Sequence, residues 1–164
     1  MKENEATVEV EGRKVHIVDL PGSNSLRYKL KQFLHNTSKI VFVVDSSDVT
    51  KTVQDISQFL YELFTNKIVN RNQIPILVCC NKQDYIIATE KEKIQEKLTQ
   101  EIETLRVTKT ETPSAHEAGE ETLELNVKGK KFTFGDAPST VTFIETSLLK
   151  GTNMDQIKKF IFNK

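Results

Sequence analysis

The 164-residue sequence has few cysteines, few glycines and no excess of either charge. The only two cysteines, Cys79 and Cys80, are adjacent, so they can form neither an ordinary disulfide nor a metal site with further cysteines. We expect them in a buried strand of a protein from a reducing compartment. Basic and acidic residues both number 23, and this balance, without a basic stripe, argues against nucleic-acid binding by the chain itself.

Long hydrophobic runs are also absent. The longest, residues 40–44 and 74–80, fall far short of the roughly 20 residues that cross a bilayer. Residues 1–6 are polar and do not resemble the apolar part of a signal peptide. The chain as it stands is therefore expected to be soluble and not secreted. With 37% hydrophobic and 28% charged residues, its composition is that of one globular domain.

Short apolar, β-branched runs are present, and each ends on a polar residue. They are residues 14–19 (K-V-H-I-V-D), Ile40–Asp45 (I-V-F-V-V-D), Ile76–Asn81 (I-L-V-C-C-N) and the shorter Val141–Glu145. Such runs are typical of parallel strands that are covered on both faces. Apolar residues at helical spacing lie between them, in residues 25–36, 53–64, 88–105 and 154–161. The alternation predicts a doubly wound α/β fold with a mostly parallel sheet.

Two segments interrupt this alternation. Residues 7–10 precede the strand at 14–19 across a Glu11-Gly12 pair, a pattern that predicts a β-hairpin. Residues 107–139 form a long polar insertion. Within the insertion, the alternating residues 122–127 and 131–134 predict a second, smaller hairpin that turns through Gly129.

The residues directly after each apolar run are the candidates for chemistry, because open α/β sheets bind ligands at the carboxyl ends of their strands. Asn81-Lys82-Gln83-Asp84 follows one such run. A carboxylate at Asp84 can accept two hydrogen bonds from the N1–H and amino group of guanine, and adenine lacks this pair of donors. Asn81 can tie neighbouring loops together, and the Lys82 stem can cover the flat base. We therefore predict a guanine-nucleotide site, with an ordinary surface turn as the alternative.

Two further turns follow apolar runs. In Asp19-Leu20-Pro21-Gly22, Asp19 is predicted to hold Mg²⁺ indirectly through a water molecule, while the Gly22 N–H reaches a γ-phosphate. The alternative is a plain Pro-Gly turn after a strand. After Val141–Glu145, the loop at Ser147 can present backbone N–H groups to the guanine O6, or it can simply lead into a helix.

These motifs together resemble the third, fourth and fifth nucleotide-binding motifs of Ras-like GTPases. More narrowly, I-V-D-L-P-G-x-x-x-L-R, I-V-F-V-V-D-S, C-N-K-Q-D and T-L-R-V-T-K are similar to β-subunits of the signal recognition particle receptor. The resemblance covers nearly the whole chain. It implies a Ras-like P-loop NTPase G domain that binds GTP and Mg²⁺, and GTP-dependent binding to the N-terminal domain of the receptor α-subunit. It also implies a place on the cytosolic face of the endoplasmic reticulum membrane, near the ribosome and translocon.

The phosphate-binding part of that family pattern is not found in the sequence. The P-loop, G-x-x-x-x-G-K-[ST], has no counterpart, since the sole Gly-Lys pair, Gly129-Lys130, is followed by Lys131 and is predicted to be a hairpin turn. The family's first strand, the helix after it, switch I and the membrane anchor are also missing. Residues 1–164 are thus interpreted as an N-terminally truncated, partial G domain that starts at the second strand. Because the missing strand is central in the family's sheet, two strands are predicted to have unpaired edges.

Two positions depart from the pattern of active GTPases. Ser23 stands where Ras-like enzymes have a glutamine that orients the attacking water, and Leu148 replaces a small residue after Ser147. We therefore expect negligible GTP hydrolysis. The predicted function is a GTP-binding regulatory subunit of the signal recognition particle receptor, which assists co-translational targeting. The alternatives are a nucleotide-independent, degenerate G-domain interaction module and an Arf- or Sar-like GTPase, against which the long insertion argues.

Overall fold

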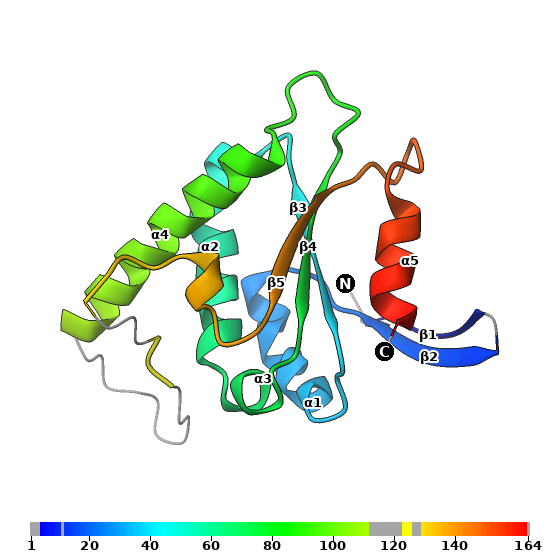
Figure 1. Cartoon of the computed structure of the whole chain (residues 1–164), viewed down its shortest axis with the longest axis horizontal. Helices are drawn as coiled ribbons and strands as arrows, with labels where there is room; N and C mark the ends of the chain where they lie inside the picture. Colours follow the sequence, from blue (N-terminus) through cyan, green and yellow to red (C-terminus); the bar gives the residue numbers. More distant parts are fainter. Residues whose placement is uncertain (1–3, 11, 112–122, 126–128, 164) are drawn as a thin grey trace.

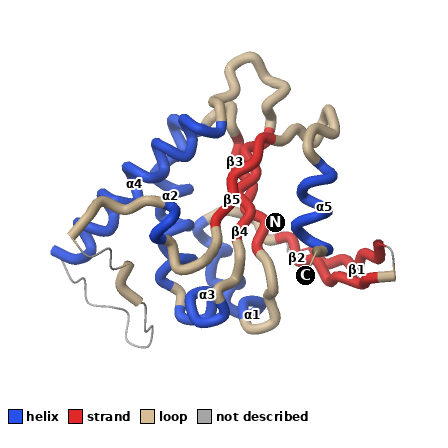
Figure 2. The backbone as a smooth tube through the Cα atoms, in the orientation of Figure 1, coloured by secondary structure: helices blue, strands red, loops and turns tan. Residues whose placement is uncertain are grey.

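A computed structural model describes residues 4–10, 12–111, 123–125 and 129–163, and it has an α/β fold (Figure 1). Within the described residues, the strands form two separate sheets. The larger sheet lies at the centre of the molecule, and the smaller one stands to its side (Figure 2). The predicted fold class is therefore confirmed, but the strands are divided differently from the single sheet that the sequence predicts.

The central sheet contains β3 (Ile40–Asp45), β4 (Ile76–Asn81) and β5 (Val141–Glu145), in the order β3-β4-β5. Both pairs are parallel, and the register places Asp45 opposite Asn81 and Cys80 opposite Glu145. The polar residues that end the three strands therefore lie side by side at one edge. This shared edge positions the candidate site.

Helices cover both faces of this sheet. On one face lie α2 (Val49–Thr65) and α4 (Lys91–Glu111), and on the other lies α5 (Met154–Phe162) (Figure 1). The helix predicted at residues 25–36 begins as the 3-10 helix η1 (Asn24–Lys29) and continues as α1 (Leu30–Leu34). A short α3 (Lys67–Asn72) follows α2, and the Asn66 side chain caps it by accepting hydrogen bonds from two backbone N–H groups.

The main hydrophobic core lies between the central sheet and the α2–α4 layer. On β4, residues 76–80 are all buried, as expected of the middle strand in a covered parallel sheet. Burial raises the pKa of the Cys79 thiol to about 11 and that of Cys80 to about 12, so both are protonated at neutral pH. The prediction that the two cysteines lie in a buried strand is confirmed.

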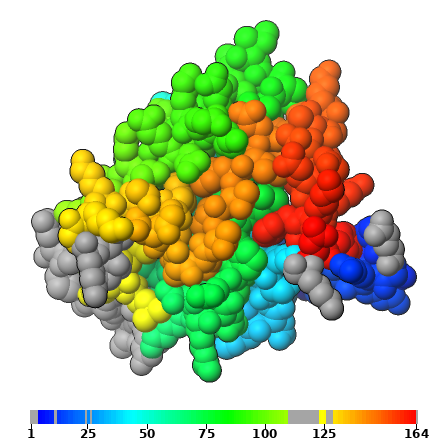
Figure 3. Space-filling model, in the orientation of Figure 1, coloured from blue at the N-terminus to red at the C-terminus, as the bar shows by residue number. Residues whose placement is uncertain are grey.

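The antiparallel hairpin of β1 (Asn4–Val10) and β2 (Arg13–Asp19) is a sheet of its own. Most of its side chains are exposed, and Arg13 connects it to the end of α5 by donating a hydrogen bond of 2.8 Å to the Phe162 carbonyl. In the space-filling view the hairpin stands at the periphery, next to α5 (Figure 3). The prediction that residues 14–19 form a strand covered on both faces is thus wrong.

The prediction of unpaired strand edges agrees with this topology. In the described part of the chain, β2 pairs only with β1, and β3 pairs only with β4. The side chain of Val43, on β3, is 59% exposed although its neighbour Val44 is buried. The face of β3 that carries Val43 is therefore less well covered than the face that carries Val44.

The insertion also differs from its prediction. Helix α4 begins at Lys91 and runs to Glu111, so its end takes up the start of residues 107–139. No second hairpin exists among the described residues of that range: residues 131–133 have no partner strand, and Phe134–Asp136 forms the 3-10 helix η2. The predicted strand at 122–127 lies only partly within the described residues, and residues 123–125 are not part of a strand.

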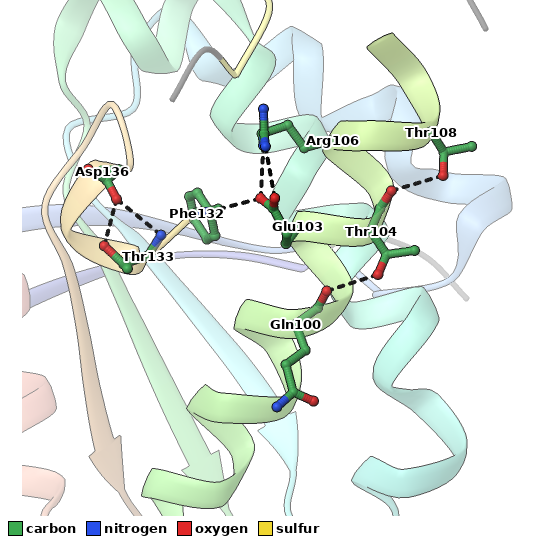
Figure 4. A network of polar contacts seen from close by, with 8 residues as sticks. All are labelled: Gln100, Glu103, Thr104, Arg106, Thr108, Phe132, Thr133 and Asp136. Atoms are coloured by element: carbon green, nitrogen blue, oxygen red, sulfur yellow. Dashed lines mark hydrogen bonds and ion pairs between the residues drawn. The ribbon is translucent and has the colours of Figure 1, made fainter. Parts of the chain in front are cut away.

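Side chains rather than strand pairing fix this segment against α4 (Figure 4). Glu103 accepts a hydrogen bond of 3.0 Å from the Phe132 backbone N–H and two of 2.8 Å from the Arg106 guanidinium. The hydrogen bonds from Arg106, aided by the Phe132 N–H and opposed by burial, lower the pKa of Glu103 to about 2. Phe132 and Phe134 then complete an aromatic cluster with Phe64, which explains why the alternating residues enter the core instead of forming a hairpin.

Candidate functional site

The candidate site lies at the edge where the three parallel strands end. The loop from β4 to α4 and the loop from β5 to α5 leave this edge at the same end of the molecule, opposite α1 and α3 (Figure 1). The start of α4 is held there, because the Lys91 N–H donates a hydrogen bond of 3.0 Å to the Glu145 side chain. This is the position at which the rule for open α/β sheets places a ligand.

Asp84 and Ser147 meet across the two loops. The Ser147 hydroxyl donates a hydrogen bond of 2.6 Å to Oδ1 of Asp84, and Ser147 Oγ in turn accepts one of 3.1 Å from the Lys150 N–H. Within the described residues, the other carboxylate oxygen, Oδ2, has no hydrogen-bond partner. The carboxylate is therefore oriented through one oxygen, while the second stays available to an incoming donor.

Asn81 joins the same loops, as the sequence predicts. Its Oδ1 accepts hydrogen bonds from the Leu148 backbone N–H at 3.1 Å and from the Thr146 hydroxyl at 3.4 Å. A further backbone bond of 3.1 Å runs from the Gln83 N–H to the Thr146 carbonyl. The amide of Asn81 thus serves as a brace between the end of β4 and the loop after β5.

Leu148 takes part in this brace through its backbone only. Its N–H, which the sequence offers as a donor to guanine O6, is engaged by Asn81, while its side chain is 67% exposed. The neighbouring Leu149 is also exposed. A leucine at this position is therefore compatible with a closed loop, because the side chain points away from the hydrogen bonds that hold the two loops together.

Lys82 lies between the two neighbouring strand ends. Its backbone has a φ of 69°, in the left-handed region, and its ammonium donates a hydrogen bond of 2.6 Å to Oδ2 of Asp45. Burial raises the pKa of Asp45, but the hydrogen bonds from Lys82 and Ser47, together with the Lys82 charge, hold that pKa below its ordinary value. The same contact raises the pKa of Lys82.

Asp45 is a residue of this site that the sequence reasoning did not select. It ends the β3 run in the same manner as Asn81 ends β4, so the rule that drew attention to Asn81 also applies to it. Neither its pairing with Lys82 nor the contact of Thr146 with Asn81 follows from spacing alone, since both depend on the register of neighbouring strands.

Asp19 and Gly22 are not brought to this cluster by any described contact. Asp19 ends β2, in the separate hairpin, and its carboxylate accepts a hydrogen bond of 3.4 Å from the Asn4 side chain. Gly22 is exposed in the segment before η1. The structure therefore gathers Asn81, Lys82, Asp84 and Ser147, and leaves Asp19 at the end of β2 and Gly22 in the segment that follows it.

Asn81, Asp84 and Ser147 present polar groups that suit the edge of a base. Asp84, Asn81 and Ser147 form a braced polar rim, but no group of three His, Cys, Asp or Glu side chains gathers within the part of the chain that is described. Gly129, with a φ of 68°, occupies a turn, and the adjacent Lys130 pairs with Asp136 at 3.3 Å. That Gly-Lys pair is thus engaged away from the strand ends.

Comparison with known proteins gives the family. The family model described as signal recognition particle receptor beta subunit matches residues 1–141. The chain belongs to this family. The mouse signal recognition particle receptor subunit beta is 37% identical over 142 residues, which cover 85% of this chain and 53% of the mouse protein. The chain thus spans about half the length of the curated relatives it matches.

Solved structures of the family share the fold. The mammalian signal recognition particle receptor matches with a TM-score of 0.81 and 33% identity, over 96% of this chain and 80% of that one. A GTP-bound SRb/SRX complex from Chaetomium thermophilum matches with a TM-score of 0.64 and 18% identity, over 88% and 70% of the two chains. An SRb-GDP-Mg structure from the same organism reaches 0.63 at 19% identity, over 79% and 70%.

In the described residues, no helix combines the length and the apolar character that crossing a bilayer requires.

Proposed function

We propose that this chain is a guanine-nucleotide-binding regulatory part of the signal recognition particle receptor. In this role it binds the N-terminal domain of the receptor α-subunit at the cytosolic face of the endoplasmic reticulum membrane, and so assists co-translational targeting. The observation that supports the proposal most directly is the Asp84–Ser147 contact of 2.6 Å, which fixes one carboxylate oxygen at the strand ends and leaves the other available. Structures of relatives with GTP, GDP and Mg²⁺ add support at the level of the family.

The chemistry of Asp84 determines which base it selects. A carboxylate accepts hydrogen bonds and donates none, so it matches two adjacent N–H donors on a base edge. Guanine presents such a pair at N1 and the amino group, whereas adenine presents an acceptor at N1. Ser147 orients the carboxylate of Asp84, and Asn81 keeps the two loops at a fixed separation. Both residues thus hold the carboxylate in position before a base binds.

The phosphates and Mg²⁺ are a separate part of the proposal. A bound Mg²⁺ supplies charge neutralisation to a triphosphate. Asp19 stays our proposed indirect ligand through water, and the Gly22 N–H our proposed γ-phosphate contact. The sequence contains no G-x-x-x-x-G-K-[ST] run, so we expect this 164-residue chain to bind nucleotides weakly and to hydrolyse GTP at a negligible rate.

A base-swap experiment tests the reading of guanine. Titration of the chain with GDP and ADP should show a preference for GDP, and Asp84→Asn should lower the affinity for GDP by about ten- to hundredfold. Because an amide can donate to the C2 carbonyl of xanthine, the same variant should gain affinity for XDP. Asp155→Asn, which removes a surface carboxylate paired with Lys159, is the control and should bind as the unmodified chain does. Equal binding of GDP and ADP by the unmodified chain would contradict the proposal.

A second candidate function is a nucleotide-independent interaction module. It is favoured by two observations. Gly129 and Lys130 are engaged in a surface turn, and the β1–β2 hairpin is a separate sheet from the central one. Capture of the α-subunit N-terminal domain, measured with GTP, with GDP and without nucleotide, separates the two candidates. Equal capture in all three conditions supports the module, and capture that depends on GTP supports the regulatory subunit.

A further inference from the structure

Asp45 connects the end of β3 to the loop that carries Asp84, and both of its carboxylate oxygens are engaged. Oδ1 accepts hydrogen bonds from the Ser47 backbone N–H at 3.0 Å and from the Ser47 hydroxyl at 2.6 Å. Oδ2 accepts the Lys82 ammonium at 2.6 Å. The two bonds from Ser47 fix the plane of the carboxylate, so that its second oxygen faces Lys82.

The Lys82 side chain is partly exposed, so the ion pair with Asp45 restricts its conformation. The backbone of Lys82 is in the left-handed region, and its ammonium lies 5.9 Å from the centre of the Tyr85 ring. The contact with Asp45 shows that the side chain reaches from the end of β4 to the end of β3. A lysine side chain that is 44% exposed would otherwise sample many rotamers, and its restriction costs conformational entropy. The ion pair with Asp45 selects one arrangement before any ligand arrives.

We propose that Asp45 is a positioning residue for base binding: it holds the Lys82 stem at the rim of the site, where the stem can lie against the flat face of a base. This inference rests on the proposed function, because it assumes that a base is read by Asp84. The proposal gives the two carboxylates different roles. Asp84 reads the edge of the base and sets its identity, whereas Asp45 acts through Lys82 on the face that all purines share.

The first test measures the ion pair without nucleotide. Asp45→Asn keeps an oxygen that can accept the Ser47 bonds, and it replaces the oxygen that faces Lys82 with an amino group. In an NMR titration of lysine side chains in the full chain, Lys82 should show a raised pKa that falls in Asp45→Asn and is unchanged in Asp155→Asn. An identical Lys82 pKa in all three proteins would overturn the proposal. Urea unfolding of Asp45→Asn checks that the fold is retained.

The second test uses GDP and IDP, which differ by the amino group that Asp84 reads. Asp45→Asn should lower the affinities for both nucleotides by a similar factor, about two- to fivefold, as expected for loss of a partly exposed ion pair. The ratio of the GDP affinity to the IDP affinity should not change. Asp45→Glu, which keeps the charge, should recover part of the loss. Unchanged affinities in Asp45→Asn, or an altered GDP/IDP ratio, would overturn the positioning role.

The two tests distinguish the possible failures. If the unmodified chain binds neither GDP nor IDP at millimolar concentration, the proposed function fails, and the role of Asp45 in base binding fails with it. The Lys82 titration still decides whether the ion pair exists in solution. If GDP binds and Asp84→Asn behaves as predicted while Asp45→Asn has no effect, the proposed function stands and only the positioning role is rejected.

Discussion

Strands β2 and β4 come from similar sequences but have opposite environments. The β2 run K-V-H-I-V-D and the β4 run I-L-V-C-C-N are both rich in apolar residues and end on a polar residue, although Lys14 and His16 interrupt the β2 run. Strand β4 is buried over residues 76–80, whereas β2 is half-buried at best. The difference comes largely from the neighbouring elements: β4 has a parallel strand on each side and helices on both faces, whereas in the described residues β2 pairs with β1 alone and also contacts α5.

This comparison shows what an apolar run can and cannot determine. It favours the extended conformation, because β-branched side chains suit a pleated strand. It does not supply the layers that cover the strand. A hairpin of two strands buries little surface and is marginally stable by itself, whereas the central sheet shares its core with α2 and α4. Stability should therefore be concentrated in the central sheet and its helices.

The largest expected effect is at the aromatic cluster, and it tests whether stability is concentrated in the central sheet and its helices. Phe64 is 1% exposed and contacts the rings of Phe132 and Phe134. Phe64→Ala should lower the free energy of unfolding by about 3–5 kcal/mol, because it leaves a cavity in the core. Tyr28→Ala removes an aromatic ring that is 58% exposed and should change stability by about 0.5 kcal/mol or less. Urea unfolding of both variants measures this contrast, and similar losses would contradict it.

The next effect concerns the polar contacts that fix the insertion to α4. Glu103→Gln should lower the free energy of unfolding at neutral pH by about 1.5–3 kcal/mol, because it weakens charge-assisted bonds from Arg106 and the Phe132 N–H. The folded-state pKa of about 2 lies below the ordinary 4.5. The contribution of the carboxylate is therefore complete above pH 4.5 and is lost as the pH falls from there towards 2.

Urea unfolding across this pH range measures the difference between the unmodified chain and Glu103→Gln, which should shrink as the pH falls. Glu96→Gln is the control on the same helix, since Glu96 is exposed and accepts only a bond of 3.3 Å from Gln100. A Glu103→Gln effect that stays constant between pH 7 and pH 3 would show that the carboxylate charge is not responsible.

Much of the fold follows from local patterns, and the exceptions have physical causes. The runs that form β3, β4 and β5 were identified with their bounds, because each is continuous, β-branched and followed by a polar residue. The second hairpin was predicted wrongly, since the alternating residues around Phe132 suit a strand as well as a segment that inserts alternate side chains into a core. Only the position of Glu103 and Phe64 in space decides between these two outcomes.

The residues of the candidate site were also predicted only in part. Asn81, Lys82, Asp84 and Ser147 were selected because each follows a buried strand, and the structure brings them together. Asp45 satisfies the same rule, but its partner became evident only when the register aligned β3 with β4. Spacing along the chain indicates which residues reach the edge of a sheet, whereas contacts between loops depend on the order of strands.

The smallest expected effect lies in the hairpin. Val8 faces Val15 on β2 and is 36% exposed, whereas Val78 on β4 is fully buried. Val8→Ala should change the free energy of global unfolding by less than about 0.5 kcal/mol, while Val78→Ala, the matched substitution in the central sheet, should cost about 2 kcal/mol. Amide hydrogen exchange should be fast in the hairpin of both proteins and faster still in Val8→Ala, because the hairpin opens without the core. Equal losses from the two substitutions would place the hairpin in the same cooperative unit as the central sheet.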